Sequence, residues 1–197
     1  MFEYKSFYLW LFQVLGLLGL LALFLWLGLR PKSPTYTIVE FSVPSSNSSN
    51  ATSLVDQGSQ DGAVLFNLEI DNPNQDSGIY HEDIFMTFYY GQDTVGQKTV
   101  PSFYQGKDET RQIVDRIDGN GQVWKTLIAA IRNATAEMKV GLVTSIRYRT
   151  LGHKSKHHQM NLQGLIKIGS DGKILGKKKK VKLTHASKKW KLRATRS

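Results

Sequence analysis

An apolar run near the N-terminus constrains this chain more than any other feature. It occupies residues 7–29, contains no charged residue in its 23 positions, and is bracketed by Lys5 and Arg30. Each residue of a helix adds about 1.5 Å, so the run spans about 34 Å, and the hydrocarbon core of a bilayer is about 30 Å thick. The run therefore predicts one membrane-spanning helix at residues 7–29, with residues 1–6 as a short cytosolic N-terminus.

A cleaved signal peptide and a buried globular helix both fit this run less well. A signal peptide has an apolar stretch of about 7–15 residues followed by a small-residue cleavage site, and the segment WLGLRPK offers no such site. A helix buried in a globular domain is rarely apolar on every face over this length. We therefore expect an uncleaved signal-anchor.

The charges of the chain are unevenly distributed. Residues 1–151 hold 12 Lys and Arg against 15 Asp and Glu, whereas residues 152–197 hold 14 Lys and Arg and one acid, Asp171. This distribution predicts a near-neutral body followed by a basic tail at residues 171–197, which a polyanionic partner would meet first. The chain has no cysteine, which excludes disulfides, a cysteine nucleophile and cysteine-ligated metals.

Glycosylation sequons indicate which side of the membrane the C-terminal part occupies. The charges that flank the run are balanced and give no orientation. Three N-x-[ST] triplets follow the run, at Asn47, Asn50 and Asn133. Such triplets also arise by chance in Ser- and Asn-rich stretches, but all three lie on one side of the anchor. We expect a glycosylated, non-cytosolic domain.

The remainder of the chain predicts mainly β structure. Residues 30–35 form a proline-containing exit linker, and alternating apolar and polar residues then predict strands. The predicted strands are residues 36–43 (with a possible bulge), 63–70, 84–90, 94–100, an extended stretch through 103–114, 137–150 and 159–168. Residues 122–133 have helical spacing instead. We expect one antiparallel β-sandwich with one short helix, at residues 36–170.

The sequence contains no persuasive catalytic, cofactor-binding or metal-binding constellation. The one histidine cluster, at His153, His157 and His158, lies in a segment that reads as a loop. Lys154 and Lys156 would repel a cation there, so a solvated basic loop is favoured over a metal site. We expect neither an enzyme nor a bound cofactor.

The lysine run of the C-terminal segment, at Lys177, Lys178, Lys179 and Lys180, is a candidate anion-binding site. A solvated edge strand that lysines protect from aggregation is the favoured single interpretation of this segment. The membrane anchor makes nucleic acid an unsuitable partner, which leaves anionic lipid or an acidic wall polysaccharide.

Several motifs occur in an order that is typical of one family. They are the exit segment Arg30-Pro31-Lys32-Ser33-Pro34-Thr35-Tyr36, then Asn72-Pro73-Asn74, Gly78-Ile79-Tyr80, Tyr89-Tyr90-Gly91 and Phe103-Tyr104-Gln105-Gly106. Over residues 7–168 the chain resembles the plant harpin-induced, non-race-specific-disease-resistance-like membrane proteins, which carry a late-embryogenesis-abundant type 2 domain. His81 stands where this family usually has a second tyrosine. The tail also departs from the family, because it is rich in lysine and lacks a cysteine.

The resemblance implies a fold, a place and a role. The fold would be a fibronectin-III-like β-sandwich, within which the Asn-Pro-Asn and Phe-Tyr-Gln-Gly motifs are fold signatures first. The protein would lie in the plasma membrane, or alternatively in the endoplasmic reticulum or another endomembrane. It would act without catalysis in plant defence or stress responses by binding an unknown protein partner. The alternative is a structural tether between membrane and wall, or a protein that protects against desiccation.

Overall fold

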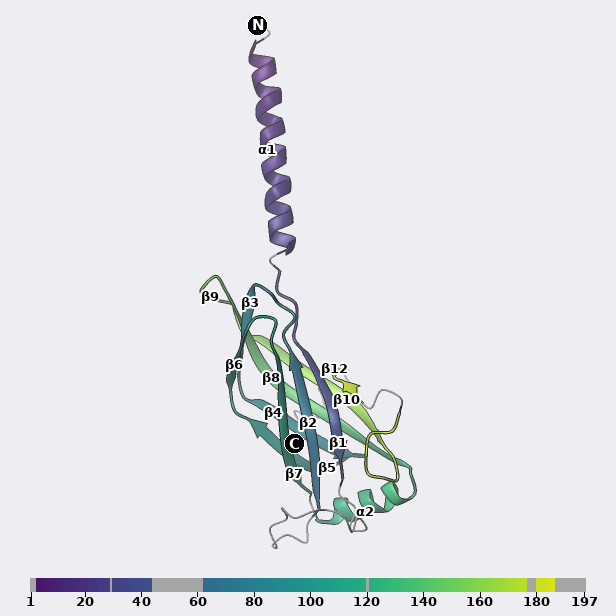
Figure 1. Ribbon diagram of the computed structural model, residues 1–197. Helices are drawn as coiled ribbons and strands as arrows, with labels where there is room; N and C mark the ends of the chain where they lie inside the picture. Colours follow the sequence, from purple (N-terminus) through teal and green to yellow (C-terminus); the bar gives the residue numbers. More distant parts are fainter. Residues whose placement is uncertain (1–2, 29, 44–61, 120, 177–179, 187–197) are drawn as a thin grey trace. The chain divides into compact units, whose positions relative to one another are not determined.

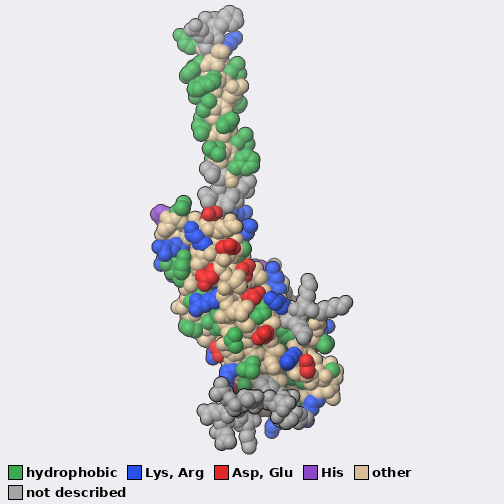
Figure 2. Space-filling view, viewed as in Figure 1, with side chains coloured by type: hydrophobic (Ala, Val, Ile, Leu, Met, Phe, Trp, Pro, Cys, Tyr) green, Lys and Arg blue, Asp and Glu red, His purple; other side chains and the backbone are tan. Residues whose placement is uncertain are grey.

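The computed structural model describes residues 3–28, 30–43, 62–119, 121–176 and 180–186, and these belong to two separate units, Met1–Lys32 and Ser33–Ser197 (Figure 1). The first unit consists of helix α1 (Glu3–Gly28). By length and composition, α1 is the one helix among the described residues that could cross a membrane, within Tyr4–Phe24. Figure 2 shows hydrophobic side chains around this helix, as a lipid-facing surface requires.

The second unit is built almost entirely from strands. In chain order these are β1 (Thr35–Ser42), β2 (Ala63–Asp71), β3 (Ser77–His81), β4 (Ile84–Tyr90), β5 (Asp93–Val100), β6 (Phe103–Gln105), β7 (Thr110–Asp118), β8 (Ala136–Thr150), β9 (His153–Lys154), β10 (His158–Ile168), β11 (Val181–Lys182) and β12 (Thr184–His185). One helix, α2 (Gly121–Arg132), lies between β7 and β8. The expected fold class, a mainly β chain with an N-terminal apolar helix and antiparallel sheets, is confirmed.

The strands form two antiparallel sheets. Sheet A has the strand order β11-β1-β2-β7. Sheet B has the strand order β12-β10-β8-β3-β6; in addition, β4 pairs with β8 and with β5, and β9 pairs with β8. Strand β8 organises sheet B, because every residue of β10 pairs with it along one edge. Its other edge pairs with β4 and then with β3, so these two short strands lie end to end along one long strand.

Aromatic contacts join the two sheets. Phe88 of β4 lies 6.1 Å from Phe41 of β1 and 5.5 Å from Phe66 of β2, measured between ring centroids. All three rings are buried. The core of the sandwich therefore lies between the facing sheets, as the alternating strand patterns require.

Helix α2 closes the end of the sandwich that lies opposite the β8–β9 turn (Figure 1). It buries Trp124, Leu127, Ala130 and Ile131, the apolar side of an amphipathic helix. The indole of Trp124 lies directly against the backbone at Gly62 and Gly119. A Cβ atom would lie only 1.9 Å from the indole if it were added at Gly62, and 2.3 Å from it if it were added at Gly119. The two glycines are joined by a hydrogen bond from Gly119 N to Gly62 O of 2.8 Å, so the indole stacks over a side-chain-free patch.

The structure refines the sequence prediction in three places. The bulge expected in the first strand lies between Ile38 and Glu40, and it turns Glu40 outward while Phe41 remains buried. Strand β3, which the alternating pattern did not predict, contains the Gly-Ile-Tyr motif. The extended stretch predicted through residues 103–114 was wrong, because a turn at residues 106–109 separates β6 from β7 and places them in different sheets.

Two short strands of the expected tail pair with the sheets. Val181 pairs with Ile38 of β1, and Thr184 pairs with Gln163 of β10. Leu183, between them, is buried. Residues 181–185 thus cross from sheet A to sheet B along one side of the sandwich.

Candidate functional site

The two most distinctive motifs of the sequence meet at one end of the sandwich. The Asn72 side chain donates from Nδ2 to the carbonyl oxygen of Gly106, 2.6 Å away, across 34 residues of chain. Two backbone hydrogen bonds hold the same pair of turns together, from Asn72 N to Glu109 O and from Asp108 N to Asn74 O, both 3.0 Å long. The Asn-Pro-Asn turn and the turn after Phe-Tyr-Gln-Gly are therefore one structural unit.

Asn72 is the centre of this unit. Its Nδ2 also donates to Ser77 O at 3.0 Å. Its Oδ1 accepts from Asn74, from the backbone N at 3.2 Å and from Nδ2 at 2.8 Å. Asn72 is fully buried, so all the hydrogen-bonding capacity of its amide is used inside the protein, as burial of a polar group requires.

Gln105 likewise holds the turn at residues 106–109 in place through side-chain hydrogen bonds. It is fully buried, and its Nε2 donates to Ile70 O at 2.9 Å and to Glu109 O at 2.6 Å. Because both of these partners are carbonyl acceptors, the amide orientation is determined, and Oε1 must serve as an acceptor. That oxygen lies 2.9 Å from Nε2 of His81.

This orientation shows which nitrogen of His81 carries a proton. Since Gln105 Oε1 can only accept, His81 Nε2 donates to it, and in the neutral ring Nδ1 accepts a hydrogen bond from the Tyr36 hydroxyl, 3.1 Å away. The result is a chain of hydrogen bonds from Tyr36 through a neutral His81 to Gln105. Tyr36 belongs to sheet A and the other two residues to sheet B, so this chain joins the two sheets within the core.

The electrostatics agree with a neutral imidazole. Burial lowers the pKa of His81 from 6.5 to about 4, the Gln105 hydrogen bond opposes this shift, and the nearby Arg111 charge adds to it. Burial also raises the pKa of Tyr36, so its phenol stays protonated. Neither group is poised to transfer a proton near neutral pH, so this network is suited to holding turns together rather than to acid–base catalysis.

The remaining signature residues divide into covered and exposed groups. Phe103 stacks on His81 at 4.6 Å between centroids, and the guanidinium of Arg111 covers its other side at 4.3 Å. Tyr80 and Tyr104 instead form a pair at 4.7 Å on the surface of sheet B, with Lys154 Nζ 4.4 Å above the Tyr80 ring. Gly78 leaves room for this pair, since a Cβ there would lie 2.1 Å from the Tyr104 hydroxyl.

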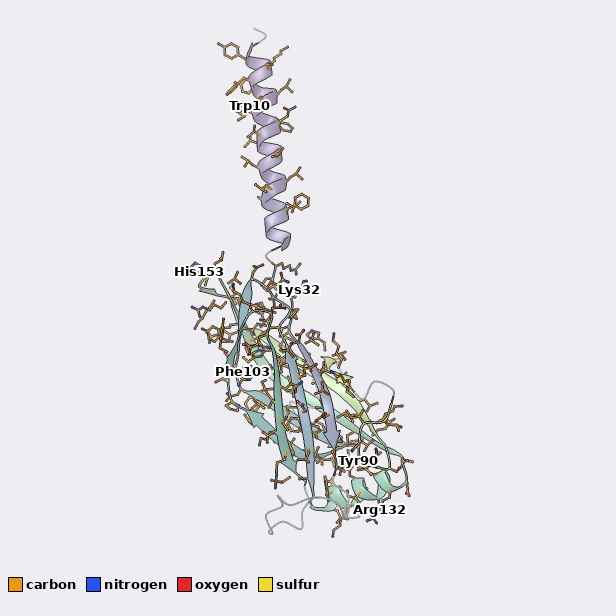
Figure 3. All side chains as sticks on the ribbon, viewed as in Figure 1. Trp10, Lys32, Tyr90, Phe103, Arg132 and His153 are labelled. Atoms are coloured by element: carbon orange, nitrogen blue, oxygen red, sulfur yellow. The ribbon has the colours of Figure 1, made fainter. Side chains whose placement is uncertain are left out.

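No group of three or more side chains suited to metal binding occurs among the described residues. His157 Nδ1 lies 2.8 Å from Glu82 Oε1, and the aromatic ring of His158 lies against Tyr148. His153 lies at the tip of the β8–β9 turn (Figure 3). The three histidines therefore have different neighbours.

A shallow groove of about 500 Å³ crosses the outer surface of sheet A. Its apolar lining includes Leu65 and Val114, whose exposed fractions are 44% and 73%. Asn67 also lines the groove, is only 7% exposed, and its Oδ1 has no hydrogen-bond partner among the described residues. This sheet A groove thus combines apolar contact area with one unpaired acceptor.

A second groove, of about 570 Å³, crosses the outer surface of sheet B. Phe85 and Val143 contribute exposed apolar surface, and Glu82 and Asp83 make its rim acidic. Asn161 in this sheet B groove also has an unpaired Oδ1 among the described residues, although its side chain is only half-buried.

The candidate modification and anion sites are only partly within the described residues. Asn133 is exposed directly after α2, where a glycan would have access to solvent. Asn47 and Asn50 lie outside the described residues, as do Lys177, Lys178 and Lys179. Lys180 is described, and its Nζ lies 3.7 Å from Glu69 Oε1, so this lysine is already engaged by an acid of sheet A.

Sequence reasoning missed the two aromatic partners of the polar network. Tyr36 read as an ordinary strand residue, and His81 was noted only as a departure from the family pattern. The available signal was that departure itself, because a histidine in place of a tyrosine needs its own hydrogen-bond partners when it is buried. No local pattern could show that residues 45 positions apart would meet.

The chain thus combines an apolar N-terminal helix with an antiparallel sandwich whose turns are locked by Asn72 and Gln105, and its sequence matches place it among the late-embryogenesis-abundant proteins. Residues 67–164 match the family described as "Late embryogenesis abundant protein". The chain is 30% identical to Protein NDR1 of Arabidopsis thaliana, covering 90% of this chain and 81% of that protein. It therefore belongs to the NDR1-like members of this family.

Further relatives agree with this membership. The chain is 35% identical to NDR1/HIN1-like protein 2 of Arabidopsis thaliana, covering 51% of this chain and 40% of that protein. It is 26% identical to NDR1/HIN1-like protein 3 of the same plant, over 71% of this chain and 65% of that protein. Among solved structures, the solution structure of AT1g01470 from Arabidopsis thaliana is similar at a TM-score of 0.42 and 12% identity, over 71% of this chain and 85% of that one. That likeness is too distant to add to the family membership.

Proposed function

We propose that this chain is a non-enzymatic, membrane-anchored protein of plant defence or stress responses, and that it acts by binding a partner through its β-sandwich. The match to Protein NDR1 over most of the chain carries the proposal. Membership of this family supports a role in defence or stress, and its members are generally not enzymes. Helix α1 supplies the length and apolar surface of an anchor.

The sheet A groove is the binding surface that we favour. A protein partner could cover the exposed side chains of Leu65 and Val114 with apolar side chains of its own. Adjoining exposed apolar side chains of this kind are typical of surfaces that bind proteins. The sheet B groove is less suitable, because Glu82 and Asp83 make its rim acidic.

A complementation experiment tests this function. Plants lacking the gene would receive the wild type, Val114→Lys, or Val143→Lys as the matched control in the sheet B groove. We expect Val114→Lys to accumulate at the membrane without restoring the pathogen or drought response, and Val143→Lys to restore it. Unchanged responses in plants without the gene would refute the proposed role, and full rescue by Val114→Lys would refute the binding surface.

We further propose that the domain lies on the outer side of the plasma membrane. The proposal rests on the three sequons that follow the apolar helix, at Asn47, Asn50 and Asn133. Glycosidase treatment of the protein from its own cells should increase its gel mobility, and a triple Asn→Gln variant should not respond. The absence of any shift in the wild-type protein would contradict the outward orientation.

A further inference from the structure

The turn between β8 and β9 has an unusual residue at its tip. Thr150 pairs with His153, so Leu151 and Gly152 form a two-residue loop of a β-hairpin. Both have positive φ, 49° for Leu151 and 83° for Gly152. A hairpin loop with two positive φ angles favours Asn, Asp or Gly at its first position, because these residues tolerate the left-handed region.

Leucine is poorly suited to this position in two respects. A bulky side chain at positive φ is strained by the approach of its Cβ to the backbone. Leu151 is also 83% exposed, the highest exposure among the large hydrophobic side chains of the described residues. Packing inside the domain therefore offsets neither the strain of the positive φ angle nor the exposure of the apolar side chain. Residues that break local conformational preferences in this way concentrate at functional positions.

The surroundings of Leu151 are basic. The segment from residue 147 to residue 158 contains Arg147, Arg149, Lys154 and Lys156 and no acid. Figure 2 shows Lys and Arg side chains beside hydrophobic ones at the end of the domain where Figure 3 labels His153. Two acids lie near this segment: Glu82 pairs with His157 further along the chain, and the exposed Asp76 precedes Ser77, which pairs with Thr150.

Two aromatic side chains continue this surface. Tyr80 and Tyr104 lie on sheet B beside the hairpin, and Lys154 lies above Tyr80. Tyr104 is 43% exposed. An exposed apolar tip with tyrosines and lysines behind it is the composition of proteins that insert into the interface of a bilayer, where rings sit among headgroups and cations meet phosphates.

The hairpin lies at the end of the domain where the chain enters it. Ser33, the first residue of the second unit, lies close enough to Tyr148 of β8 for its side chain to oppose the rise that burial causes in the pKa of that tyrosine. Helix α1 ends at Gly28, and the five residues from there to Ser33 can extend at most about 18 Å. A domain on so short a connection keeps this end within reach of the membrane surface.

We propose that the β8–β9 hairpin is a membrane-docking tip. Leu151 inserts between the headgroups of the leaflet that the domain faces in the bilayer that holds α1, while Arg149, Lys154 and Lys156 bind the phosphates of anionic lipids in that same leaflet. This inference rests on the proposed anchoring by α1, and it adds a second, reversible contact that sets the orientation of the domain. The lysine run at residues 177–180 plays no part in it.

The absence of cysteine makes the proposal directly testable. The full chain with Leu151→Cys has one thiol, which can carry a polarity-sensitive fluorophore, and Leu175→Cys is the matched control. Leu175 is a leucine that is 60% exposed, and it lies beside Lys167 near the start of β8, roughly 40 Å of strand away from the hairpin. Both proteins would be reconstituted into bilayer discs of phosphatidylcholine, with or without phosphatidylserine.

In discs that contain phosphatidylserine, we expect the fluorescence emission of the label at residue 151 to shift to the blue. A water-soluble quencher should also quench this label several-fold less than it does without phosphatidylserine. The label at 175 should not change. High salt, or the combined Arg149→Gln, Lys154→Gln and Lys156→Gln substitutions, should reverse the change, because headgroup contacts are screened. Phosphatidylcholine discs should give a much smaller effect.

Three results would overturn the docking tip. The first is an equal signal from the labels at 151 and 175 in anionic discs. The second is protection of the label at 151 from the quencher that changes neither with salt nor with the three Gln substitutions. The third is the same protection in detergent micelles, which would indicate a protein contact. Failure of the full chain to incorporate into discs would refute anchoring by α1 instead. The two proposals can therefore fail separately.

Discussion

Asn72 and His81 show how single side chains define this fold. Each is buried, and each connects segments that are distant in the sequence, Asn72 by joining two turns and His81 by joining the two sheets. Buried polar groups are costly unless every partner is present. These residues therefore favour one arrangement of the turns over its alternatives.

The first prediction concerns Asn72. Asn72→Ala should lower the free energy of unfolding by about 3 kcal/mol, because it leaves the carbonyls of Ser77 and Gly106 buried without a donor. Asn72→Asp should be at least as harmful, since a carboxylate cannot donate. Urea unfolding would measure both, with the exposed Asn133→Ala as the control. A loss below about 0.5 kcal/mol for Asn72→Ala would contradict the assigned network.

The second prediction is a pH dependence that arises from His81. Its pKa is about 4 in the folded protein against 6.5 in the unfolded chain, so the unfolded state binds more protons between these values. Stability should therefore be full above pH 6.5 and fall as the pH decreases toward 4, by about 3 kcal/mol in total and about 2 kcal/mol by pH 5.

His81→Gln separates this effect from other titrations. The variant starts from a lower stability, but its change in unfolding free energy between pH 7 and pH 5 should be smaller than that of the wild type by the amount attributed to His81. Parallel pH profiles for the two proteins would show that His81 is not the group responsible.

At the scale of elements, the β8–β9 hairpin should show a trade-off between the stability of the domain and the proposed docking to a membrane. Leu151→Asn suits the left-handed position and should raise the free energy of unfolding by about 1 kcal/mol. The same change removes the apolar side chain at the tip of the hairpin. It should therefore abolish the fluorescence shift that docking is expected to cause, measured with a fluorophore attached at a residue next to position 151. A stability unchanged or lowered by Leu151→Asn would show that the turn geometry does not disfavour leucine.

Helix α2 should depend on the glycines beneath its tryptophan. Gly119→Ala would place a methyl group within 2.3 Å of the Trp124 indole, so the ring must move and expose apolar surface. We expect a loss of about 2 kcal/mol together with a red shift in tryptophan emission. Gly121→Ala is the control, because a Cβ there meets nothing within 4 Å and Gly121, like Gly119, has no positive φ.

The elements predicted from the sequence are those whose pattern is local. The alternation in residues 63–70 and 84–90 reflects one buried face per strand, and it located β2 and β4 closely. Strand β3 was missed because it is short and shows no alternation: Ser77, Gly78 and Ile79 are buried one after another. The break after Gln105 depends on hydrogen bonds to Asn72 and Glu109, which no periodicity reveals.

At the scale of the whole molecule, charge placement makes a further prediction. Replacing Lys177, Lys178, Lys179 and Lys180 by Gln removes four charges from a chain whose formal net charge is +10. If this run binds anions, retention on an acidic polysaccharide should decrease, and the difference from wild type should vanish at high salt. Equal retention at low salt would assign polyanion binding to another part of the chain.

The candidate site could be predicted only in outline. Order and spacing of the motifs identified the family and the residues of the two turns, because these motifs are contiguous in sequence. The grooves could not be foreseen, since Val114 of β7 meets Leu65 and Asn67 of β2 only through the register of the two strands. The docking tip depends on the φ angle of Leu151, which the sequence alone does not reveal.

The point at which the chain enters the sandwich also determines how the domain responds to a mechanical pull. If α1 anchors the chain as proposed, tension from the membrane acts at Ser33 and then along β1, whose residues pair with β2 from Thr35↔Asp71 to Ser42↔Leu65. If a partner holds the α2 end of the domain, these hydrogen bonds are strained together, in shear, rather than opened one at a time. A sandwich entered in this way resists extension and can transmit force between a bilayer and whatever its far end grips.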